Sequence, residues 1–281
     1  MPRLLILCVL IPFIASAQAQ TSGSAWTKLF NGQDLSGWNK YLGPALDSAG
    51  KKWNGIPLGW NNDPQNIFTV VPDNGSKVIR ISGQSWGALS TLSEYSNYHL
   101  QLQFKWGSHT WAEKRNKPRD SGLLYHGNGE PENSGWMQSQ EFQIEENDCG
   151  DYWTVGKVKI LIRSIKDTGI KYIYDPKGEW KLFGDSGYNW CHRPYAKESP
   201  AGQWNTLDLY CSGDTSVHVV NGEVVMILYH SQRVANGRTV PLTRGKIQLQ
   251  SEGAELYYKE IKIQSISALP VALGVKGQRD R

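Results

Sequence analysis

Two glutamates and a glutamine occupy alternate positions of one short segment: Glu141, Gln143 and Glu145. Alternate residues of an extended strand face the same side, so these three polar side chains would share one face and two apolar residues the other. Like charges this close repel unless a ligand, a cation or a shared proton compensates them. At about 3.3 Å per residue the Cα atoms of Glu141 and Glu145 lie roughly 13 Å apart. Side chains that lean together would bring the carboxyls to about 5–9 Å, the spacing of acid–base pairs in sugar hydrolysis. The alternative is an ordinary solvated strand face.

The elements that must position this segment repeat with a period of two. Between Tyr98 and Trp106, apolar residues alternate with polar ones, which predicts a strand with one buried and one solvated face. The same alternation recurs at 78–81, 207–211, 217–219, 247–249 and 261–263. Asn221-Gly222, between two β-rich runs, predicts a hairpin turn. No long amphipathic helical pattern is present, so the sequence predicts an all-β sandwich of two antiparallel sheets with long loops.

Aromatic and amide side chains supply candidate substrate contacts. The chain has 12 Trp and 13 Tyr, which suit either a β core or a sugar-stacking surface. Trp136 and Trp111 lie in polar loops, where stacking on a ligand is favoured. Gln248 and Gln250 share one face of a late strand, so sugar contact and plain solvation are both open. His192 either lines a cleft or packs within its loop.

The N-terminus predicts export. One positive charge, an apolar run at 4–14 and the small-residue sequence Ala17-Gln18-Ala19 are typical of a secretory signal peptide covering 1–19. The apolar run is shorter than the roughly 20 residues that span a bilayer as a helix. We therefore expect a secreted or periplasmic protein without a membrane span. One domain at 20–268 would be followed by a flexible tail at 269–281.

Charge and cysteine content limit the expected partners and disulfides of the protein. The net charge of +4 is small and the basic residues are scattered, so nucleic acid is not an expected partner. Nothing in the sequence specifies an oligomeric state. Three cysteines follow the signal peptide, and export permits disulfides. A bridge between Cys149 and Cys191 is a hypothesis, with Cys211 as a buried free thiol.

The acidic segment resembles a known catalytic strand. Laminarinase-type retaining glycosidases carry Glu-hydrophobic-Asp-hydrophobic-Glu, and residues 141–145 of this chain read Glu-Phe-Gln-Ile-Glu. In that family the central Asp tunes the nucleophile, and Gln143 stands in its place here. The resemblance thus points to carbohydrate chemistry but weakens direct glycoside hydrolysis.

A second resemblance extends over almost the whole chain. The motifs that carry it follow in order at 26–38 (WTKLFNGQDLSGW), 92–98 (LSEYSNY), 120–126 (DSGLLYH), 141–144 (EFQI), 202–205 (GQWN), 220–222 (VNG) and 245–253 (GKIQLQSEG). Together they resemble the 3-keto-disaccharide hydrolase domain family, whose fold is a concanavalin A-like jelly roll. The chain departs from the family at Asp120, where Asn is commoner, and at His126, where many members have Arg.

This family resemblance implies an enzyme that acts on glycosides already oxidised to a ketone at C3. The ketone acidifies the hydrogen on C2, a base removes it, the resulting enolate expels the C1 aglycone, and water adds back. Glu141 is the first candidate for the base or a metal ligand, and His126 is the second. Glu145 would be the acid or a second ligand. Gln143 would contact substrate, and Lys105 would stabilise the enolate if it faces the same surface.

A bound cation and two alternative functions also remain open. A divalent cation, held by Glu141, Glu145 and His126, would also stabilise an enolate. A non-catalytic lectin-like carbohydrate-binding module and a conventional retaining glycosidase are the alternatives to the keto-glycoside enzyme. Lectins seldom need paired carboxylates on one strand face unless they bind a cation, so the acidic strand favours an enzyme.

Overall fold

A computed structural model of the protein describes residues 24–46, 52–111, 114–132, 135–169, 171–184 and 187–275, and the expected signal peptide lies outside them. Antiparallel strands form nearly all the regular structure of these residues, and one short 3-10 helix, η2 (Val271–Leu273), follows the last strand. Within the described part of the chain, no helix is long and apolar enough to cross a membrane. The predicted all-β sandwich is confirmed.

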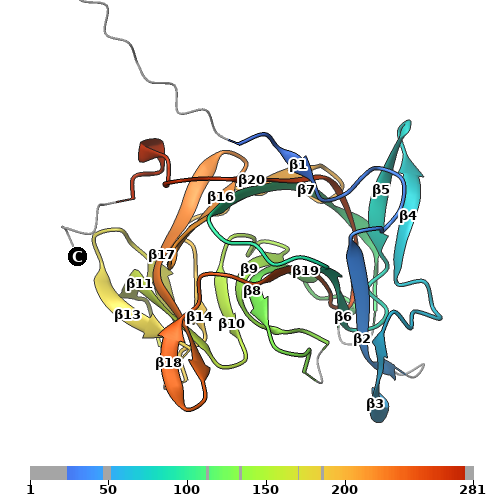
Figure 1. Ribbon diagram of the computed structural model, residues 1–281, viewed down its shortest axis with the longest axis horizontal. Coiled ribbons are helices and arrows are strands. Elements are labelled where there is room, and N and C mark those ends of the chain that lie inside the picture. Colours follow the sequence, from blue (N-terminus) through green and yellow to red (C-terminus); the bar gives the residue numbers. More distant parts are fainter. Residues whose placement is uncertain are drawn as a thin grey trace, which may run out of the picture.

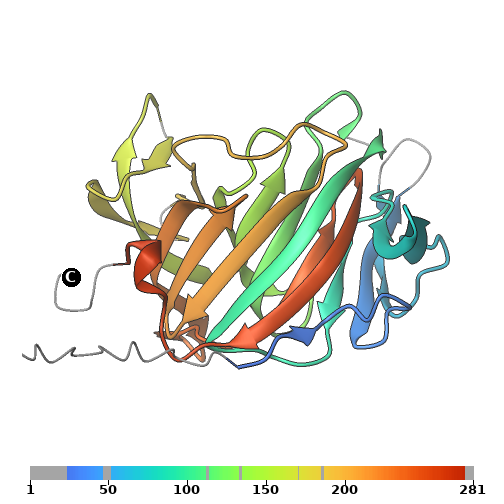
Figure 2. The ribbon, with the colours of Figure 1, turned by 90° about the horizontal axis from the view of Figure 1, so that it is seen from above.

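The larger of the two sheets has 12 strands and arches over the smaller one (Figures 1 and 2). Nine strands follow one another across it in the order β12-β11-β17-β16-β15-β7-β20-β5-β4, with β1, β13 and β18 paired at the side. Their bounds are β1 (Thr27–Lys28), β4 (Phe68–Asp73), β5 (Ser76–Ile81), β7 (Tyr98–Thr110), β11 (Val158–Lys166), β12 (Tyr172–Tyr174), β13 (Glu179–Phe183), β15 (Asn205–Ser212), β16 (Thr215–Val220), β17 (Glu223–Ala235), β18 (Arg238–Pro241) and β20 (Ala254–Ser265).

The smaller sheet has eight strands in the order β14-β10-β9-β8-β19-β6-β2-β3, and it carries the acidic segment near its middle. Its strands are β2 (Trp38–Leu46), β3 (Lys52–Trp60), β6 (Gly87–Thr91), β8 (Asp120–Asn128), β9 (Gln138–Glu145), β10 (Tyr152–Val155), β14 (Trp190–Cys191) and β19 (Lys246–Ser251). The acidic strand β9 lies between β8 and β10, so its backbone is hydrogen-bonded on both sides. It is therefore held more firmly than an edge strand would be.

The main core fills the space between the two sheets. Leu100, Leu102 and Phe104 of β7 are fully buried there against Phe142 and Ile144 of β9 and the other members of one apolar cluster. The buried residues of β7 alternate with partly exposed ones, as its sequence pattern predicts. This packing fixes which face of β9 points inward. Glu141, Gln143 and Glu145 consequently face away from the core.

A second apolar cluster is formed by β10 and β14 of the smaller sheet with β11, β12, β13, β16 and β17 of the larger one, and it bears on two expectations. Cys191 belongs to this cluster and Cys149 to the main core, and both are buried free thiols, so the expected bridge between them is wrong. Leu269 and Val275 pack against the second cluster. The first part of the tail that we expected to be flexible thus has packing contacts.

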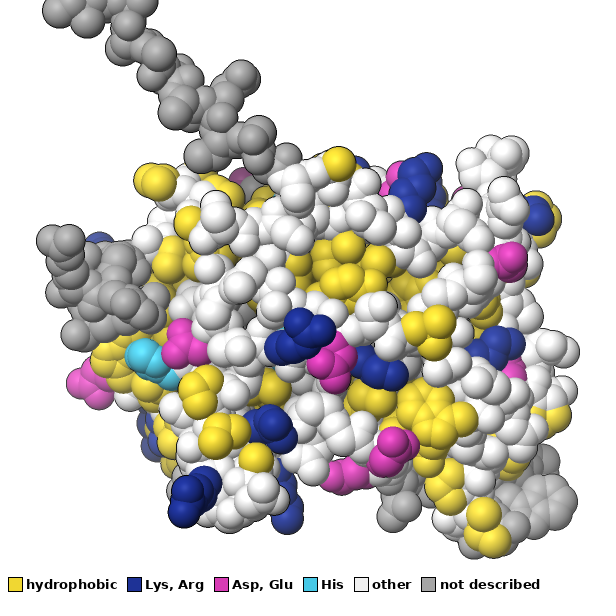
Figure 3. Space-filling view, viewed as in Figure 1, with side chains coloured by type: hydrophobic (Ala, Val, Ile, Leu, Met, Phe, Trp, Pro, Cys, Tyr) yellow, Lys and Arg dark blue, Asp and Glu magenta, His cyan; other side chains and the backbone are white. Residues whose placement is uncertain are grey.

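Charges are mixed on the face of the molecule seen in Figure 3. Basic and acidic side chains alternate there among polar and apolar ones, without a large area of one sign. This agrees with the small net charge of +4. Electrostatic steering of a highly charged partner by this face is therefore not indicated.

Candidate active site

The outward face of β8 and β9 forms the floor of a cavity of about 470 Å³. In the register of the two strands, Asp120 lies opposite Glu145, and Gly122 lies opposite Gln143. Glu141 is only 6% exposed and Gln143 only 5%, so the alternative of an ordinary solvated strand face is excluded. Loops and neighbouring strands wall this face off. Enclosure strengthens every electrostatic interaction inside the cavity.

Acidic side chains dominate the cavity, with one lysine among them. Its lining residues are Lys114, Asp120, Glu132, Trp136, Gln138, Glu141, Gln143, Glu145, Trp153, Thr154, Val155, Gly156 and Glu252. Lys114 forms a close ion pair with Asp120, and its Nζ lies 4.0 Å from Glu145 Oε1. Burial opposes the charge on Lys114, but Asp120, Glu252 and Glu145 raise its pKa above the ordinary value, so it stays cationic.

The two glutamates of β9 differ in their affinity for protons. Burial, reinforced by the negative charge of Asp120, raises the pKa of Glu141 well above its ordinary value. Burial also raises the pKa of Glu145, helped by Asp120 and opposed by Lys114, but only to about 7. Near neutral pH, Glu141 therefore holds its proton while Glu145 is close to half ionised. A proton donor and a proton acceptor thus lie on one strand face.

Asp120 and Glu252 complete the group of carboxyls. Burial raises the pKa of Asp120, and Lys114 opposes that rise. Burial, together with the charges of Asp120 and Glu141, raises the pKa of Glu252 well above its usual range. Four carboxyls around one ammonium group cannot all ionise without strong repulsion, so the cavity retains protons at neutral pH.

Gln143 and Gln250 surround Glu141 with amides. The Gln143 amide nitrogen donates to Asp120 Oδ1 and Glu145 Oε2, both at 3.3 Å, and in the opposite amide orientation it would donate to Glu141 Oε1 at 3.0 Å. A hydrogen bond from Gln250 lowers the pKa of Glu141, against the larger effect of burial. Gln143 therefore links Asp120 and Glu145 in one amide orientation and reaches Glu141 in the other, and Gln250 lies beside the Glu141 carboxyl.

Gly122 leaves the space that the Glu141 carboxyl occupies. A Cβ atom built at this position would collide with Glu141 Oε1 and Gln250 Oε1. We expect Gly122→Ala to displace both side chains and to lower kcat at least about tenfold, because small misplacements of catalytic groups are costly. The matched control is Gly127→Ala on the same strand, since Gly127 has no positive φ and the nearest atoms to an added Cβ lie 3.3 Å or more away. Equal kcat for both variants, measured with unchanged folding by circular dichroism, would contradict this assignment.

Several predicted residues lie at or beside the cavity. Glu141, Glu145, Gln143 and Trp136 line it, and Trp136 also donates from Nε1 to the Gly87 carbonyl at 2.9 Å and stacks on Trp86. Gln248 and Gln250 project from the same face of the sheet. Both side chains are completely buried, so contact with solvent does not explain why these positions are polar. The Gln248 amide oxygen accepts a hydrogen bond from the Met137 backbone nitrogen at 2.9 Å.

Lys105 and His126 are not brought to this cavity. Lys105 lies on the solvent face of the other sheet, where it pairs with Asp73 at 3.1 Å. His126 sits at an irregularity in β8 with φ of 55°, and its ring packs against Tyr98 and Tyr125 inside the sandwich. Burial lowers the pKa of His126 to about 4. The expected juxtaposition of these two residues with Glu141 is therefore not found.

His192 and Trp111 also lie outside the lining. His192 Nδ1 lies 2.8 Å from Asp151 Oδ2, and its ring contacts Trp190. Trp111 Nε1 donates to the Ser82 carbonyl at 2.8 Å, which anchors the loop that carries Lys114. These contacts with neighbouring segments thus account for the positions of both side chains.

An aromatic surface borders the cavity instead. Trp153 lies opposite Glu141 in the register of β10 with β9, and it stacks on Trp190 with ring centroids 5.1 Å apart. Because Trp153 lines the cavity, one of its edges is available to a sugar ring or an aglycone. The sequence pointed to Trp136 and Trp111 but not to this pair. Lys114 and Glu252 were also not predicted as site residues.

The described residues contain one group of potential metal ligands, and it lies outside the cavity. Ligand atoms of Asp148, Asp151 and His192 lie within 4.8 Å of one another. However, Arg193 already donates to Asp151 Oδ1 at 2.8 Å and to Asp148 Oδ1 at 3.0 Å. A cation there would have to displace this guanidinium. In the cavity itself, the Lys114 ammonium group already supplies a positive charge among the carboxyls. The predicted cation site of Glu141, Glu145 and His126 is not formed, because the His126 ring packs inside the sandwich and does not line the cavity.

Comparison with known proteins places the chain in a family. Residues 25–264 match the 3-keto-α-glucoside-1,2-lyase-like domain, and the chain belongs to that family. The protein is thus a carbohydrate-active domain with a concanavalin A-like sandwich fold, as the sequence motifs implied. No curated protein is similar enough in sequence to count as a relative.

Solved structures with a related arrangement of strands are distant in sequence. A protein from Parabacteroides distasonis, provisionally described as a glycosyl hydrolase, is 19% identical with a TM-score of 0.48, over 86% of this chain and 94% of that one. A β-glucanase from Bacillus licheniformis is 12% identical with a TM-score of 0.42, over 88% of this chain and all of that one. The carbohydrate-binding module CBM66 from Bacillus subtilis is 10% identical with a TM-score of 0.40, over 70% and 92% of the two chains.

Proposed function

We propose that the protein cleaves the glycosidic bond of 3-keto-glycosides by elimination across C1 and C2, followed by addition of water. The observation that carries this proposal is the pair of glutamates on β9, one held protonated and one with a pKa of about 7, beside the partly buried ammonium group of Lys114. Elimination needs a base, an acid and a positive charge near the enolate oxygen. Membership of the lyase-like family supports the same chemistry.

The residues take roles that follow from their protonation. Glu145, as carboxylate, removes the proton from C2, and the electron pair moves onto the C3 carbonyl oxygen beside Lys114. As the enolate collapses, the C1–O bond breaks and Glu141 gives its proton to the departing aglycone oxygen. This collapse re-forms the C3 ketone and leaves a C1=C2 double bond. Water then adds across that bond: its hydroxide goes to C1 as Glu141 takes the other proton, and Glu145 returns a proton to C2, which gives the free 3-keto sugar and resets both glutamates. Relative to the sequence-based hypothesis, the acid and the base have changed places.

The lectin-like alternative is less consistent with this cavity. A binding module gains nothing from buried carboxyls with raised pKa values, and burying such groups costs folding free energy. A conventional retaining glycosidase with Glu141 as its ionised nucleophile is disfavoured, because burial keeps this carboxyl protonated. We further propose that the protein acts after export, as the signal-peptide pattern at its N-terminus indicates.

Turnover of matched substrates tests the proposal. The purified protein is incubated with a 3-keto-glucoside and with its unoxidised parent, and aglycone release is followed with and without added divalent metal. Release from the keto form alone is the expected result, because only a C3 ketone acidifies C2. Incorporation of deuterium from solvent at C2 of the product would verify proton removal and return there. Release from the parent sugar at a similar rate would overturn the elimination chemistry in favour of a glycosidase.

A further inference from the structure

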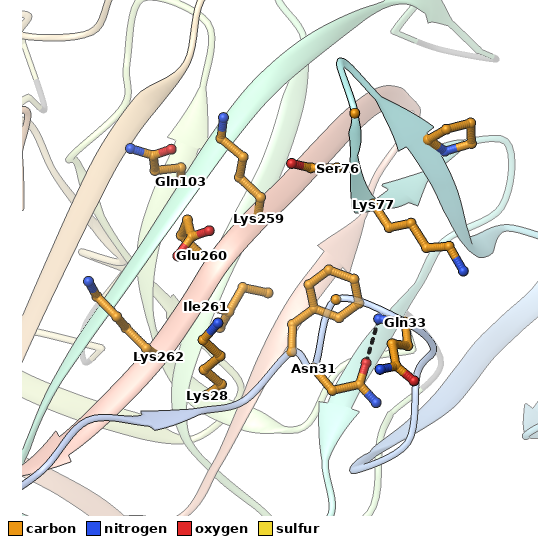
Figure 4. A pocket seen from close by; sticks show the side chains of 14 residues that line it. Lys28, Asn31, Gln33, Ser76, Lys77, Gln103, Lys259, Glu260, Ile261 and Lys262 are labelled. Atoms are coloured by element: carbon orange, nitrogen blue, oxygen red, sulfur yellow. Dashed lines mark hydrogen bonds between the residues drawn. The ribbon is translucent and has the colours of Figure 1, made fainter.

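A second cavity lies on the opposite side of the molecule, on the solvent face of the larger sheet (Figure 4). It encloses about 650 Å³ between the N-terminal segment at 27–33, the β4–β5 hairpin and β20. Its charged lining residues are Lys28, Lys77, Lys259, Lys262 and Glu260. Four lysines and one glutamate thus line a single groove, which we call the lysine groove.

The strand register brings two of these lysines together. Lys28 of β1 lies directly opposite Lys262 of β20 in an antiparallel pair. Side chains directly opposite one another in such a pair are neighbours, and like charges at these positions are destabilising. An anion bound between the two side chains would remove this repulsion.

A bulge in β20 adds a third lysine to the same face. Lys259 lies opposite Gln103 and Lys262 opposite Gln101, so one extra residue has been inserted between positions that would otherwise alternate. Glu260, in this bulge, has a φ of 50°, a conformation that is costly for a residue with a side chain. Without the bulge, Lys259 and Lys262 would point to opposite faces. The strained bulge at Glu260 therefore places Lys259 and Lys262 on the same face of the sheet.

Neutralisation within the protein does not explain the cluster. Among the residues that the structure describes, none of the four lysines of the groove forms an ion pair with a carboxylate, whereas nearby Lys105 pairs with Asp73. Lys259 Nζ lies 4.0 Å from the centroid of the Trp204 ring, and Lys262 Nζ lies 4.9 Å from that of Trp26. These contacts orient the ammonium groups of Lys259 and Lys262 without neutralising them, whereas Lys77 interacts with the exposed Asp34, whose pKa is lowered mainly by hydrogen bonds from Ser36 and in smaller part by Lys77.

We propose that the lysine groove is a secondary site that binds a polyanionic glycan, a chain bearing carboxylate or sulfate groups. The spacing of cationic groups along a groove suits a linear polymer, and Trp26, which is 38% exposed, offers a ring for stacking beside it. A membrane surface is less suitable, since peripheral binding also requires an apolar face that inserts between the lipids. Because the core separates this groove from the acidic cavity, both sites can be filled at once.

Binding of the whole protein to polygalacturonate, dextran sulfate and neutral dextran tests this inference, with anionic phospholipid vesicles as a fourth probe. We expect binding to at least one of the charged glycans, with the preferred one identifying carboxylate or sulfate. Lys28→Gln combined with Lys262→Gln should weaken that binding about tenfold or more, since two charge-assisted contacts are lost. Glu260→Gln, which removes the one carboxylate of the groove, should strengthen it.

The control must remove the same charge elsewhere. Lys166→Gln combined with Lys177→Gln, at two exposed positions on other segments, leaves the groove intact. Equal weakening in both double variants would show that binding depends on net charge alone and would overturn the proposal. Binding to vesicles but to neither charged glycan, or to none of the probes, would overturn it as well. Turnover of a small keto-glycoside should be the same in all these variants.

Discussion

Glu145→Gln should lower kcat by a factor of about 10²–10⁴, the usual contribution of a positioned general base. The amide cannot accept the C2 proton, and no other group on the β9 face has a pKa near neutrality. Because glutamine has nearly the size and shape of glutamate, the hydrogen bond from Gln143 can be retained. The loss should therefore fall on kcat and leave KM nearly unchanged.

The pH profile gives this prediction a second readout. The pKa of Glu145 is raised to about 7, so the ionised base accumulates as the pH rises through that value. The rate of the native enzyme should rise accordingly between about pH 6 and 8 and should fall again when Glu141 finally loses its proton. In Glu145→Gln the residual rate should lack the rise near pH 7.

Glu146→Gln is the matched control for this experiment. Glu146 adjoins Glu145 in the sequence but pairs with Arg119 at 2.7 Å outside the cavity lining. Its replacement should leave both kcat and the pH profile close to those of the native enzyme. A Glu145→Gln enzyme with native kcat, or one that keeps the rise near pH 7, would exclude Glu145 as the base.

The fold could be predicted because its main signal is local. A period of two in residues 98–106 determines which side chains of β7 are buried, and the same rule places Phe142 and Ile144 inward. The alternation does not determine which strands become neighbours. β20 pairs with both β7 and β5, contacts that depend on the closure of long loops. The register that places Asp120 beside Glu145 was also beyond pattern reasoning, because it depends on the irregularity between Tyr125 and Asn128 of β8.

The site was predicted only where side-chain direction follows from alternation. Glu141, Gln143 and Glu145 share a face as expected, but their burial depends on walls contributed by other segments. Lys105 also alternates outward, yet it does so from the other sheet. At His126 the regular alternation fails, because a local irregularity with positive φ turns the ring into the core. Lys114 lies in a loop, where no periodic rule assigns a direction.

Glu141→Gln should abolish most turnover while making the protein more stable at neutral pH. The folded protein holds the Glu141 proton far more tightly than the unfolded chain, whose ordinary pKa is 4.5. For a pKa raised by folding, the associated stabilisation is complete below 4.5 and is lost as the pH rises toward the folded pKa. Glutamine carries no such proton, so its advantage over glutamate should grow by up to about 1.4 kcal/mol per pH unit across this window.

Thermal unfolding across pH 4–8 measures this difference. Near pH 4 the two proteins should have similar Tm values, and above pH 5 the variant should melt progressively higher, by about 2–4 °C for each kcal/mol. Glu179→Gln, at an exposed position of β13, should show a constant offset instead. A Tm difference that is independent of pH would mean that burial does not hold the Glu141 proton in the folded protein.

The leaving group separates the roles of the two glutamates. A glycoside of nitrophenol departs as a stable anion and needs little help from an acid, whereas an alkyl glycoside requires protonation of its oxygen. Glu141→Gln should therefore damage turnover of the alkyl 3-keto-glucoside far more than that of the nitrophenyl compound. Glu145→Gln should impair both alike, because each substrate must lose its C2 proton. If Glu141→Gln impaired turnover of both substrates equally, Glu141 would not be the acid. Its burial would then affect only the stability of the fold.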